Sequence, residues 1–282
     1  MNAFDIKAGV RFVAACAWVP LQRLLDATPW PGVRATILNY HSVSPEFHPE
    51  RFNIHPEEFE LHLRWLRGNS RIVSLDTILA SLQSSKPLPP NTVAVTFDDG
   101  YEDNHRFAWP LLRKYKAPAA FFIATGYIDG SVDFFPNSVW CPLSWNQIRE
   151  MNADSLVTFG AHSHSHRSMG SLAHADAVAD IKESKRRLEH ELGETVRYFA
   201  YPNGQCADIP AMGDQILESL GFVAGFTTVW GRHHATRDRF HLPRARVDAN
   251  DTETVLRLKI NGGYDFLRPI HRFNPNWRVG ES

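Results

Sequence analysis

The chain has 282 residues, which suits one large α/β domain or two small ones, and its 43% hydrophobic content is ordinary for a globular protein with a full core. Thirty basic residues nearly balance thirty-one acidic ones, so no overall field attracts nucleic acid, and we expect no nucleic-acid partner. Cys16, Cys141 and Cys206 lie far apart without a C-x-x-C pair, which argues against a disulfide framework and a thiolate metal site.

The first 33 residues contain an apolar run, from Phe12 to Leu21, that follows Lys7 and Arg11. The run is too short to span a bilayer, and no small-x-small cleavage site follows it. We therefore expect residues 1–33 to form an amphipathic helical segment that packs on the domain or lies on a membrane surface, rather than a cleaved signal peptide. This expectation favours a cytoplasmic location, or one peripheral to the membrane, over secretion.

From residue 34 to residue 268, short apolar runs alternate with helical patterns, which is typical of βα units around a parallel sheet or barrel. Each expected strand is short and apolar enough to be buried on both faces. The expected strands are 36–40, 71–73, 92–97, 119–123, 156–160, 198–201 and 224–227. About seven parallel strands suit an α/β barrel better than an open three-layer fold.

Helices, loops and the tail complete this expected pattern. Pro56 opens a helix that Gly68 closes, and another helix is predicted over about 173–192. The stretch 131–143 is expected to form a long loop over the barrel mouth. Residues 269–282 are expected to form an irregular tail.

The strongest signal for chemistry is Thr96-Phe97-Asp98-Asp99-Gly100, where an apolar strand runs into two adjacent carboxylates and a glycine. A turn or a helix cap also uses Asp and Gly. Adjacent side chains diverge, however, so one carboxylate can bind a metal while the other stays ionised beside that cation and takes a proton from water. The motif therefore indicates one metal ligand and one base, in an order that stays open at this point.

A second signal is His162-Ser163-His164-Ser165-His166, which follows another expected strand. Two imidazoles four positions apart would come together on one side of a helical turn, while His164 would point elsewhere. A lone histidine is usually structural, but three within five residues at a strand end favour a metal. His162, His166 and Asp99 together make a set of two histidines and a carboxylate. Such a set leaves coordination positions open, as a catalytic zinc or similar ion requires.

Two further segments end expected strands. The run Tyr198-Phe199-Ala200-Tyr201-Pro202-Asn203-Gly204 by itself indicates only a turn. His41, which ends Ile37-Leu38-Asn39-Tyr40-His41, is either a buried structural histidine or a proton donor to a leaving amine. All four segments follow strands, and active sites of barrels gather at the carboxyl ends of strands. Their shared location favours one common site.

At these residues the sequence resembles the polysaccharide deacetylase family, which shares the NodB homology domain, over roughly residues 34–246. In the family's first motif, the first aspartate, here Asp98, is the general base and the second, here Asp99, is a metal ligand. The segment 162–166 resembles the second motif, H-[ST]-x-x-H, which supplies both histidine ligands. The resemblance implies a distorted (β/α) barrel, a divalent metal that is most often Zn²⁺, and hydrolysis of N-acetyl groups on a glycan substrate with N-acetylated amino sugars.

The segment after the strand 198–201 resembles the family's third motif, Arg-x-Pro-Tyr-Gly, with two departures. Ala200 stands where the arginine would be, and Asn203 replaces the tyrosine. The resemblance implies that Tyr201, Pro202 and Asn203 bind substrate, and that the backbone N–H after the proline helps to bind the oxyanion. Another residue must therefore take the role that the arginine has in the family.

The late motif that usually supplies the general acid is not evident after Arg246. Instead, Tyr40-His41 resembles the permuted branch of the family, which acts on poly-N-acetylglucosamine-type exopolysaccharides and takes its acid from an early histidine. The segment 240–244 also resembles that branch, which makes Arg244 the candidate substitute for the missing arginine and a substrate-binding residue. His241 is the competing candidate for the acid.

Some of these residue types also occur in proteins with other functions. A glycosidase also uses paired acids, but adjacent aspartates do not flank a bond from opposite sides, and the histidines would have no role. A non-catalytic glycan-binding module on the same fold predicts the loss of a ligand or the base, yet all four residues are present. A deacylase of another small N-acyl substrate would retain them. No residue pattern predicts an oligomeric state.

Overall fold

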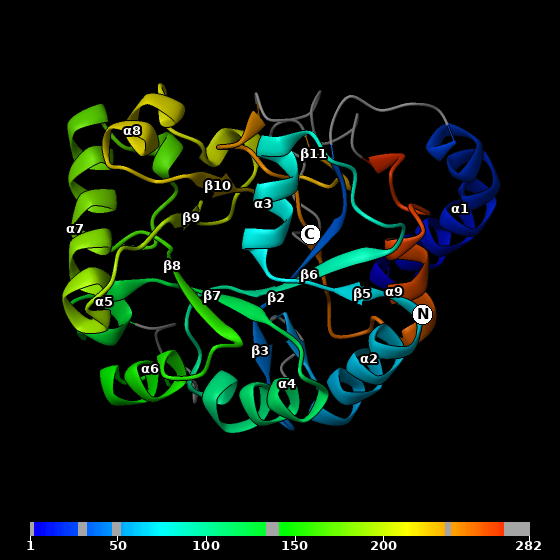
Figure 1. The fold of residues 1–282 in the computed structure, drawn as a ribbon, viewed down its shortest axis with the longest axis horizontal. Coiled ribbons are helices and arrows are strands. Elements are labelled where there is room, and N and C mark those ends of the chain that lie inside the picture. Colours follow the sequence, from blue (N-terminus) through cyan, green and yellow to red (C-terminus); the bar gives the residue numbers. More distant parts are fainter. Residues whose placement is uncertain (1–2, 28–32, 47–51, 134–140, 235–237, 268–282) are drawn as a thin grey trace.

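The structure is a computed structural model that describes residues 3–27, 33–46, 52–133, 141–234 and 238–267. Short strands alternate with helices along most of the chain (Figure 1). The strands are β1 (Val33–Arg34), β2 (Thr36–Tyr40), β3 (Ser42–Val43), β4 (Asn53–Ile54), β5 (Arg71–Ile72), β6 (Thr92–Phe97), β7 (Ala119–Ile123), β8 (Val157–Ala161), β9 (Tyr198–Ala200), β10 (Ala224–Phe226), β11 (His233–His234) and β12 (Ala245–Arg246).

The α-helices are α1 (Ala3–Asp26), α2 (Pro56–Asn69), α3 (Leu75–Ser84), α4 (Trp109–Tyr115), α5 (Thr125–Ile128), α6 (Trp145–Asn152), α7 (His174–Leu192), α8 (Gly213–Ser219) and α9 (Glu253–Ile260). A π-helix, Asn104–Ala108, precedes α4. The helices expected from Pro56 and over 173–192 are confirmed as α2 and α7. However, α2 continues through Gly68 to Asn69, and Ser70 is its C-cap. Residues 134–140 of the expected loop and the tail 269–282 lie outside the described residues.

The central sheet has the strand order β10-β9-β8-β7-β6-β2-β12, and β5 pairs with the first half of β6. Its paired strands are parallel, with Leu38 opposite both Val95 of β6 and Ala245 of β12. The expected distorted barrel and its seven strands are confirmed, although four strands begin or end one residue from the expected positions. The eighth strand, β12, is two residues long and has too little pattern to be recognised in the sequence.

The segment 242–246 joins the two ends of the sheet. The Leu242 N–H donates to the Gly225 carbonyl (2.8 Å), and the Thr227 N–H donates to the Leu242 carbonyl (2.9 Å), which ties this segment to β10. A few residues later the same segment becomes β12 and pairs with β2. Arg244 lies between these two attachments, so the chain carries a guanidinium into the barrel wall at its point of closure.

Successive strand residues alternate between two buried layers, as parallel strands with both faces covered require. The inner layer fills the barrel and is continuous with α3, and it includes Ile37, Ala94, Phe122, Phe226 and Ile78. The outer layer lies between the sheet and the surrounding helices, and it includes Leu38, Val95, Phe121, Leu63 and Leu188. Alternating burial therefore fixes which side chains at the strand ends face the barrel axis.

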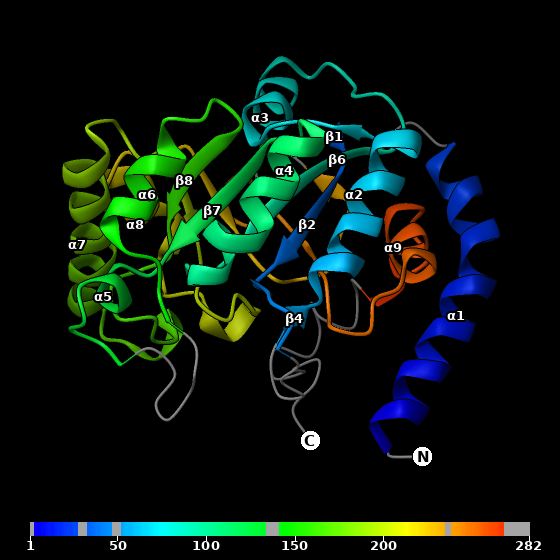
Figure 2. The same cartoon turned by 90° about the horizontal axis from the view of Figure 1, so that it is seen from below.

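Helix α1 lies beside α9 at the edge of the domain (Figure 2). It continues through Pro20, and the Trp18 and Phe266 rings meet edge to face at 6.0 Å. Several large apolar side chains of this helix are exposed: Val10, Val13, Leu21, Leu24 and Leu25. Residues 3–26 of the first segment are therefore helical and lie against the domain, while contact with a membrane surface stays a prediction. Within the described residues, no helix has the length and hydropathy needed to cross a bilayer.

Candidate metal centre and active site

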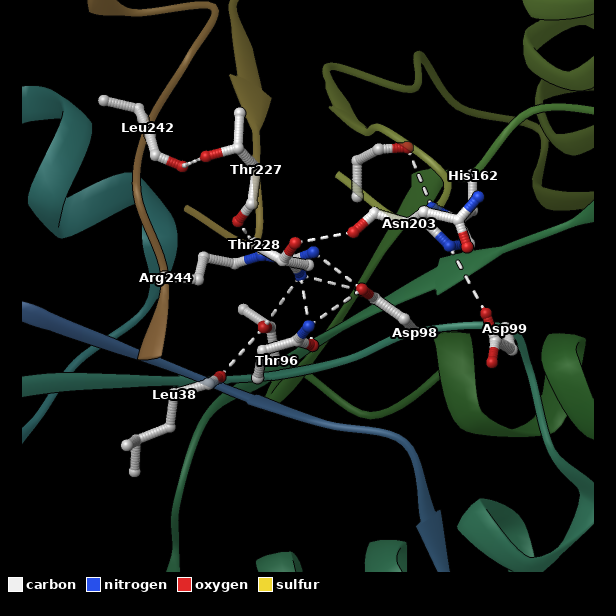
Figure 3. A network of polar contacts seen from close by, with 12 residues as sticks. Leu38, Thr96, Asp98, Asp99, His162, Asn203, Thr227, Thr228, Leu242 and Arg244 are labelled. Atoms are coloured by element: carbon white, nitrogen blue, oxygen red, sulfur yellow. Dashed lines mark hydrogen bonds and ion pairs between the residues drawn. The ribbon is translucent and has the colours of Figure 1, made fainter. Parts of the chain in front are cut away.

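The four segments expected to carry chemistry meet at the carboxyl ends of the parallel strands. Asp98 and Asp99 follow β6, His162 follows β8, His41 follows β2, and Asn203 lies three residues after the end of β9. Figure 3 shows Asp98, Asp99, His162 and Asn203 converging, with Arg244 reaching Asp98 from the segment before β12. The barrel topology thus gathers residues that are far apart in the sequence.

Asp99, His162 and His166 form a compact cluster of potential metal ligands. The Asp99 Oδ1 atom lies 3.3 Å from His162 Nε2 and 3.0 Å from His166 Nε2. One ligand atom from each residue lies within 4.8 Å of the others. Two imidazole nitrogens and a carboxylate oxygen are the donors of catalytic zinc sites that keep positions open for water and substrate.

The tautomer of His162 provides a test of whether these residues fit a cation. His162 Nδ1 lies 2.8 Å from the Ala200 carbonyl oxygen, which can only accept, so Nδ1 carries a hydrogen. In the neutral ring Nε2 is then an acceptor, and it faces the Asp99 carboxylate, which is also an acceptor. A proton or a cation must lie between them, and a carbonyl that orients the outer nitrogen is typical of metal-binding histidines. The donor set therefore fits a divalent metal.

Electrostatic effects support the same interpretation of Asp99. Burial acts to raise the pKa of Asp99, but His166 and His162 outweigh it and hold the pKa well below its usual range. Burial acts to lower the pKa of His162, but the Asp98 and Asp99 carboxylates raise it overall. Positive charge near Asp99 therefore stabilises its carboxylate form. A bound cation would supply such charge.

The turn that carries His162 and His166, the two candidate ligand histidines, is not helical, which corrects the expectation that helical spacing brings them together. Ser163 and His166 have left-handed backbone, with φ of 64° and 55°, and the His166 N–H donates to Ser163 Oγ (2.9 Å). Asp180 of α7 accepts from the N–H groups of His164 and Ser165. Side-chain acceptors thus build this turn, and Asp180 lies too far along the chain to reveal it in the sequence.

His164, the middle histidine of that turn, points away from the cluster as expected. Its Nδ1 lies 3.0 Å from Thr125 Oγ1, and its Nε2 lies 3.3 Å from Ser131 Oγ. These hydroxyl contacts occupy both ring nitrogens. His164 is therefore a natural control for the two ligand histidines.

Asp98 faces the other way, toward Arg244. The Arg244 Nη1 atom donates to Asp98 Oδ1 (2.8 Å) and Nη2 donates to Oδ2 (2.6 Å), while Asn39 Nδ2 also donates to Oδ2 (3.0 Å). Burial acts to raise the pKa of Asp98, but the Arg244 guanidinium outweighs it and holds the pKa below its usual range. The divergence of the two aspartates is thus confirmed, and Asp98 is kept as a carboxylate.

Arg244 is fully buried, and the barrel wall satisfies its remaining donors. Its Nε donates to the Thr227 carbonyl (3.0 Å), and Nη1 also contacts Thr96 Oγ1 and Asn39 Oδ1, both at 3.2 Å. The guanidinium is therefore fixed by the barrel wall and orients the Asp98 carboxylate. A role of Arg244 in contacting substrate stays a prediction.

Sequence reasoning missed Asn39, which contacts both members of this pair. A signal was present, because Asn39 is the polar residue near the end of the apolar strand Thr36–Tyr40, and it is fully buried. Buried polar side chains need hydrogen-bond partners, so an amide in such a strand indicates a polar group inside the barrel.

His41 lies at the same mouth, directly after β2. Burial is the main cause that lowers the pKa of His41, and the nearby Asp99 and Asp98 carboxylates oppose it. Its ring packs 4.9 Å from the Phe52 ring, and its buried Nδ1 has no hydrogen-bond partner among the described residues. His41 therefore sits close to both aspartates, as its expected role requires.

The competing histidine, His241, is placed differently. Its Nε2 lies 3.2 Å from Asp214 Oδ1 of α8, and its ring stacks on Tyr201 at 6.1 Å. The Tyr201 side chain is fully buried and also meets Phe199 edge to face. The Tyr201 ring thus belongs to the layer between sheet and helices, whereas the His241 side chain is 39% exposed. A substrate contact of Tyr201 stays a prediction.

The Pro202-Asn203-Gly204 turn presents a backbone donor. The Gly204 N–H bonds to the Pro202 carbonyl (2.7 Å), and Thr228 Oγ1 donates to the Asn203 carbonyl (2.5 Å). Gly204 has φ +69°, and a Cβ there would meet the Thr228 nitrogen at 2.7 Å, so the turn requires glycine. Asn203 is exposed, and among the described residues its N–H has no acceptor, which leaves it available to an oxyanion.

The chain is similar to several known proteins. The polysaccharide deacetylase family model matches residues 85–225. The poly-beta-1,6-N-acetyl-D-glucosamine N-deacetylase of Escherichia coli (strain K12) is 26% identical over 251 residues, which cover 77% of this chain and 37% of that protein. The protein of the same name from Staphylococcus epidermidis is 27% identical over 247 residues, which cover 79% of this chain and 82% of that protein.

A solved structure, IcaB from Ammonifex degensii, is similar with 28% identity and a TM-score of 0.66. The match covers 83% of this chain and 100% of that one. The chain therefore spans the full solved bacterial structure but little more than a third of the Escherichia coli relative. The similarity extends over the barrel that carries the candidate site.

Proposed function

The chain belongs to the polysaccharide deacetylase family, and from this premise we propose that it is a metal-dependent hydrolase that removes N-acetyl groups from the amino sugars of a polysaccharide. The observation that carries the proposal is the contact of His162 Nε2 and His166 Nε2 with one Asp99 oxygen. Asp99, His162 and His166 would hold a divalent metal, with zinc as the first candidate for this donor set. Such an ion, when bound, polarises the acyl carbonyl and lowers the pKa of water.

Asp98 is the proposed general base. The Arg244 ion pair keeps it ionised, and it lies beside the ligand Asp99 without sharing its partners. Asp98 takes a proton from the attacking water while the water oxygen bonds to the acyl carbon. The exposed Asn203 N–H donates to the oxyanion that forms on the acyl oxygen.

His41 is the proposed general acid. It donates a proton to the sugar nitrogen as the carbon–nitrogen bond breaks, so the amine leaves neutral and the acyl group leaves as a carboxylic acid or its anion. The position of His41 near Asp98 and Asp99 supports this role, and His241 is engaged by Asp214 instead. An early histidine at the end of β2 thus replaces the late motif.

The proposed substrate is a poly-N-acetylglucosamine-type exopolysaccharide. Two relatives named for poly-beta-1,6-N-acetyl-D-glucosamine support this choice, and so does the placement of His41 at the barrel mouth. The alternatives are a non-catalytic glycan-binding module and a deacylase of a small N-acyl substrate.

The test measures acetate release and metal content together. The purified protein, stripped with a chelator and then reloaded with zinc, should release acetate from β-1,6-linked N-acetylglucosamine oligomers only in the reloaded form. The β-1,4-linked oligomers and monomeric N-acetylglucosamine serve as comparison substrates. Binding without release would favour the non-catalytic module, and faster release from the monomer would favour the small-substrate deacylase.

A further inference from the structure

The backbone around His41 is fastened by two adjacent side chains from the segment after β6. Asn104 Nδ2 donates to the His41 carbonyl (2.8 Å). Asp103 Oδ2 accepts from Ser42 Oγ (2.6 Å), and its Oδ1 accepts from the Val43 N–H (2.9 Å). Three successive residues of the loop that carries the proposed acid are therefore held by one pair of neighbours.

The two side chains form a buried and internally connected clamp. Asn104 is fully buried, Asp103 is 6% exposed, and Asn104 Nδ2 also donates to Asp103 Oδ1 (2.9 Å). The contacts go to the backbone and hydroxyl of the loop rather than to the His41 ring. Their effect on chemistry must therefore act through the position of the ring.

The clamp belongs to the same stretch of chain as the base and the metal ligand. Asp98 and Asp99 precede Asp103 by a few residues, and the Asp98 N–H donates to the Tyr40 carbonyl (3.0 Å), just before His41. The π-helix that begins at Asn104 accompanies Pro110, which has no N–H for a regular helical bond. One continuous segment after β6 thus carries the proposed base, the candidate metal ligand and the clamp.

On its other side, the same loop is held by β4 and by the Asn53 side chain. Its strand β3 pairs with β4 over only two residues, Ser42 opposite Asn53 and Val43 opposite Ile54. The Asn53 side chain accepts from the Ser44 N–H (3.0 Å), which secures the opposite flank. Because a displacement of about 1 Å in a reacting group can cost about 10²-fold in rate, the clamp is placed where it matters for proton transfer.

We propose that Asp103 and Asn104 are positioning residues that hold the His41 loop against the loop of Asp98 and Asp99, so that acid, base and metal ligand keep one mutual geometry. The proposal rests on the proposed role of His41 as the general acid. On this proposal, the clamp affects the rate at which the leaving group is protonated, and it does not affect metal binding.

The test compares two substrates that differ in their need for an acid. An amide in a glycan releases an amine that must be protonated, whereas 4-nitrophenyl acetate releases a stable phenolate that needs no proton. Asp103→Asn and Asn104→Ala should lose about 10- to 10²-fold in turnover on the glycan, with metal content and ester turnover near those of the unaltered protein. Asp265→Asn is the matched control, since Asp265 is a buried carboxylate that accepts from Trp230 and Arg232 instead.

Each outcome separates the clamp from the acid. Equal losses on both substrates, no loss on either, or the same substrate split in Asp265→Asn would overturn the clamp. His41→Ala must itself show the split, and if it lowers both rates alike, the acid role fails whatever the clamp variants do. If His41→Ala shows the split and the clamp variants do not, only the clamp proposal fails. If the protein does not hydrolyse the ester, the pH–rate profile on the glycan is the alternative test. A clamp variant that keeps both the alkaline limb and the full maximum rate of the unaltered protein would overturn the clamp proposal.

Discussion

Arg244 and Asp98 lie 146 positions apart in the sequence and form a fully buried, two-pronged ion pair at 2.8 and 2.6 Å. Removing two charges from water is costly, and such a pair is retained only where hydrogen bonds satisfy its remaining groups. Thr227, Asn39 and Thr96 supply those bonds. The segment that closes the barrel therefore also sets the charge state of the proposed base.

Arg244→Lys tests this relationship. Lysine keeps the charge but loses the two-pronged geometry, so Asp98 should be held less firmly and its pKa should rise. Because a base must be deprotonated to act, the acidic limb of the pH–rate profile should move to higher pH, with turnover reduced by roughly 10-fold or more and metal content retained. An unchanged acidic limb would show that Arg244 does not control the base.

Asp98→Asn tests the base itself. The amide keeps the shape of the side chain but cannot take a proton, so turnover should fall by at least ~10²-fold. The metal should remain, since Asp98 contacts Arg244 and Asn39 whereas the ligand histidines contact Asp99. Metal analysis and acetate release on the same sample check both parts. Near-normal turnover would assign the proton transfer to another group.

The ligand assignment is tested by a pair of alanine variants from one turn. His162→Ala removes a nitrogen that faces Asp99, so tight zinc binding and activity should be lost together. His164→Ala removes a ring that contacts Thr125 instead, so zinc content should be unchanged. Zinc measured by mass spectrometry after dialysis decides the matter. Full zinc content in His162→Ala would contradict the assignment.

Much of the barrel was predictable because its strands are continuous apolar runs, as at Thr92–Phe97 and Ala119–Ile123, where both predicted limits are correct. The cluster of candidate metal ligands was predictable because Asp99 and His162 lie within two residues of the ends of such runs. The non-helical turn at His162 and His166 was not, since it depends on Asp180 of α7. The buried role of Asn39 was missed because its partner Arg244 joins it only when the barrel closes.

His62 provides a prediction about stability. Its Nε2 lies 2.7 Å from the Asp251 carbonyl oxygen and must carry the hydrogen, so Nδ1 accepts from the Tyr40 hydroxyl (3.1 Å). Burial is the main cause that lowers the pKa of His62, from 6.5 to about 4. Between pH 6.5 and about pH 4, His62 is therefore protonated in the unfolded chain and neutral in the folded protein. His62 should contribute a loss of stability of up to about 3 kcal/mol as pH falls from 6.5 toward 4, and none above 6.5.

Chemical denaturation at several pH values checks this contribution. His62→Gln removes the titrating ring, so the difference in free energy of unfolding between the two proteins should change across that window and be constant above it. The comparison cancels the contributions of other groups. A constant difference from pH 4 to pH 7 would contradict a buried, neutral His62.

The last prediction concerns the general acid. His41 lies near Asp98 and Asp99, and its pKa is lowered by burial against the opposing charges of both carboxylates. An acid must be protonated to act, so it accounts for the alkaline limb of the pH–rate profile. His41→Ala should keep metal and substrate binding but lose that limb and most of the turnover on the glycan.

His241→Ala is the matched comparison, because His241 was the competing candidate in the sequence. In the structure it pairs with Asp214 and stacks on Tyr201, so its removal should leave the alkaline limb in place and reduce turnover by less than His41→Ala does. The limb is informative because it depends on the protonated acid and not on how much folded protein is present. An inactive His241→Ala beside an active His41→Ala would reverse the assignment, and with it the main structural reason for expecting an exopolysaccharide of the poly-N-acetylglucosamine type.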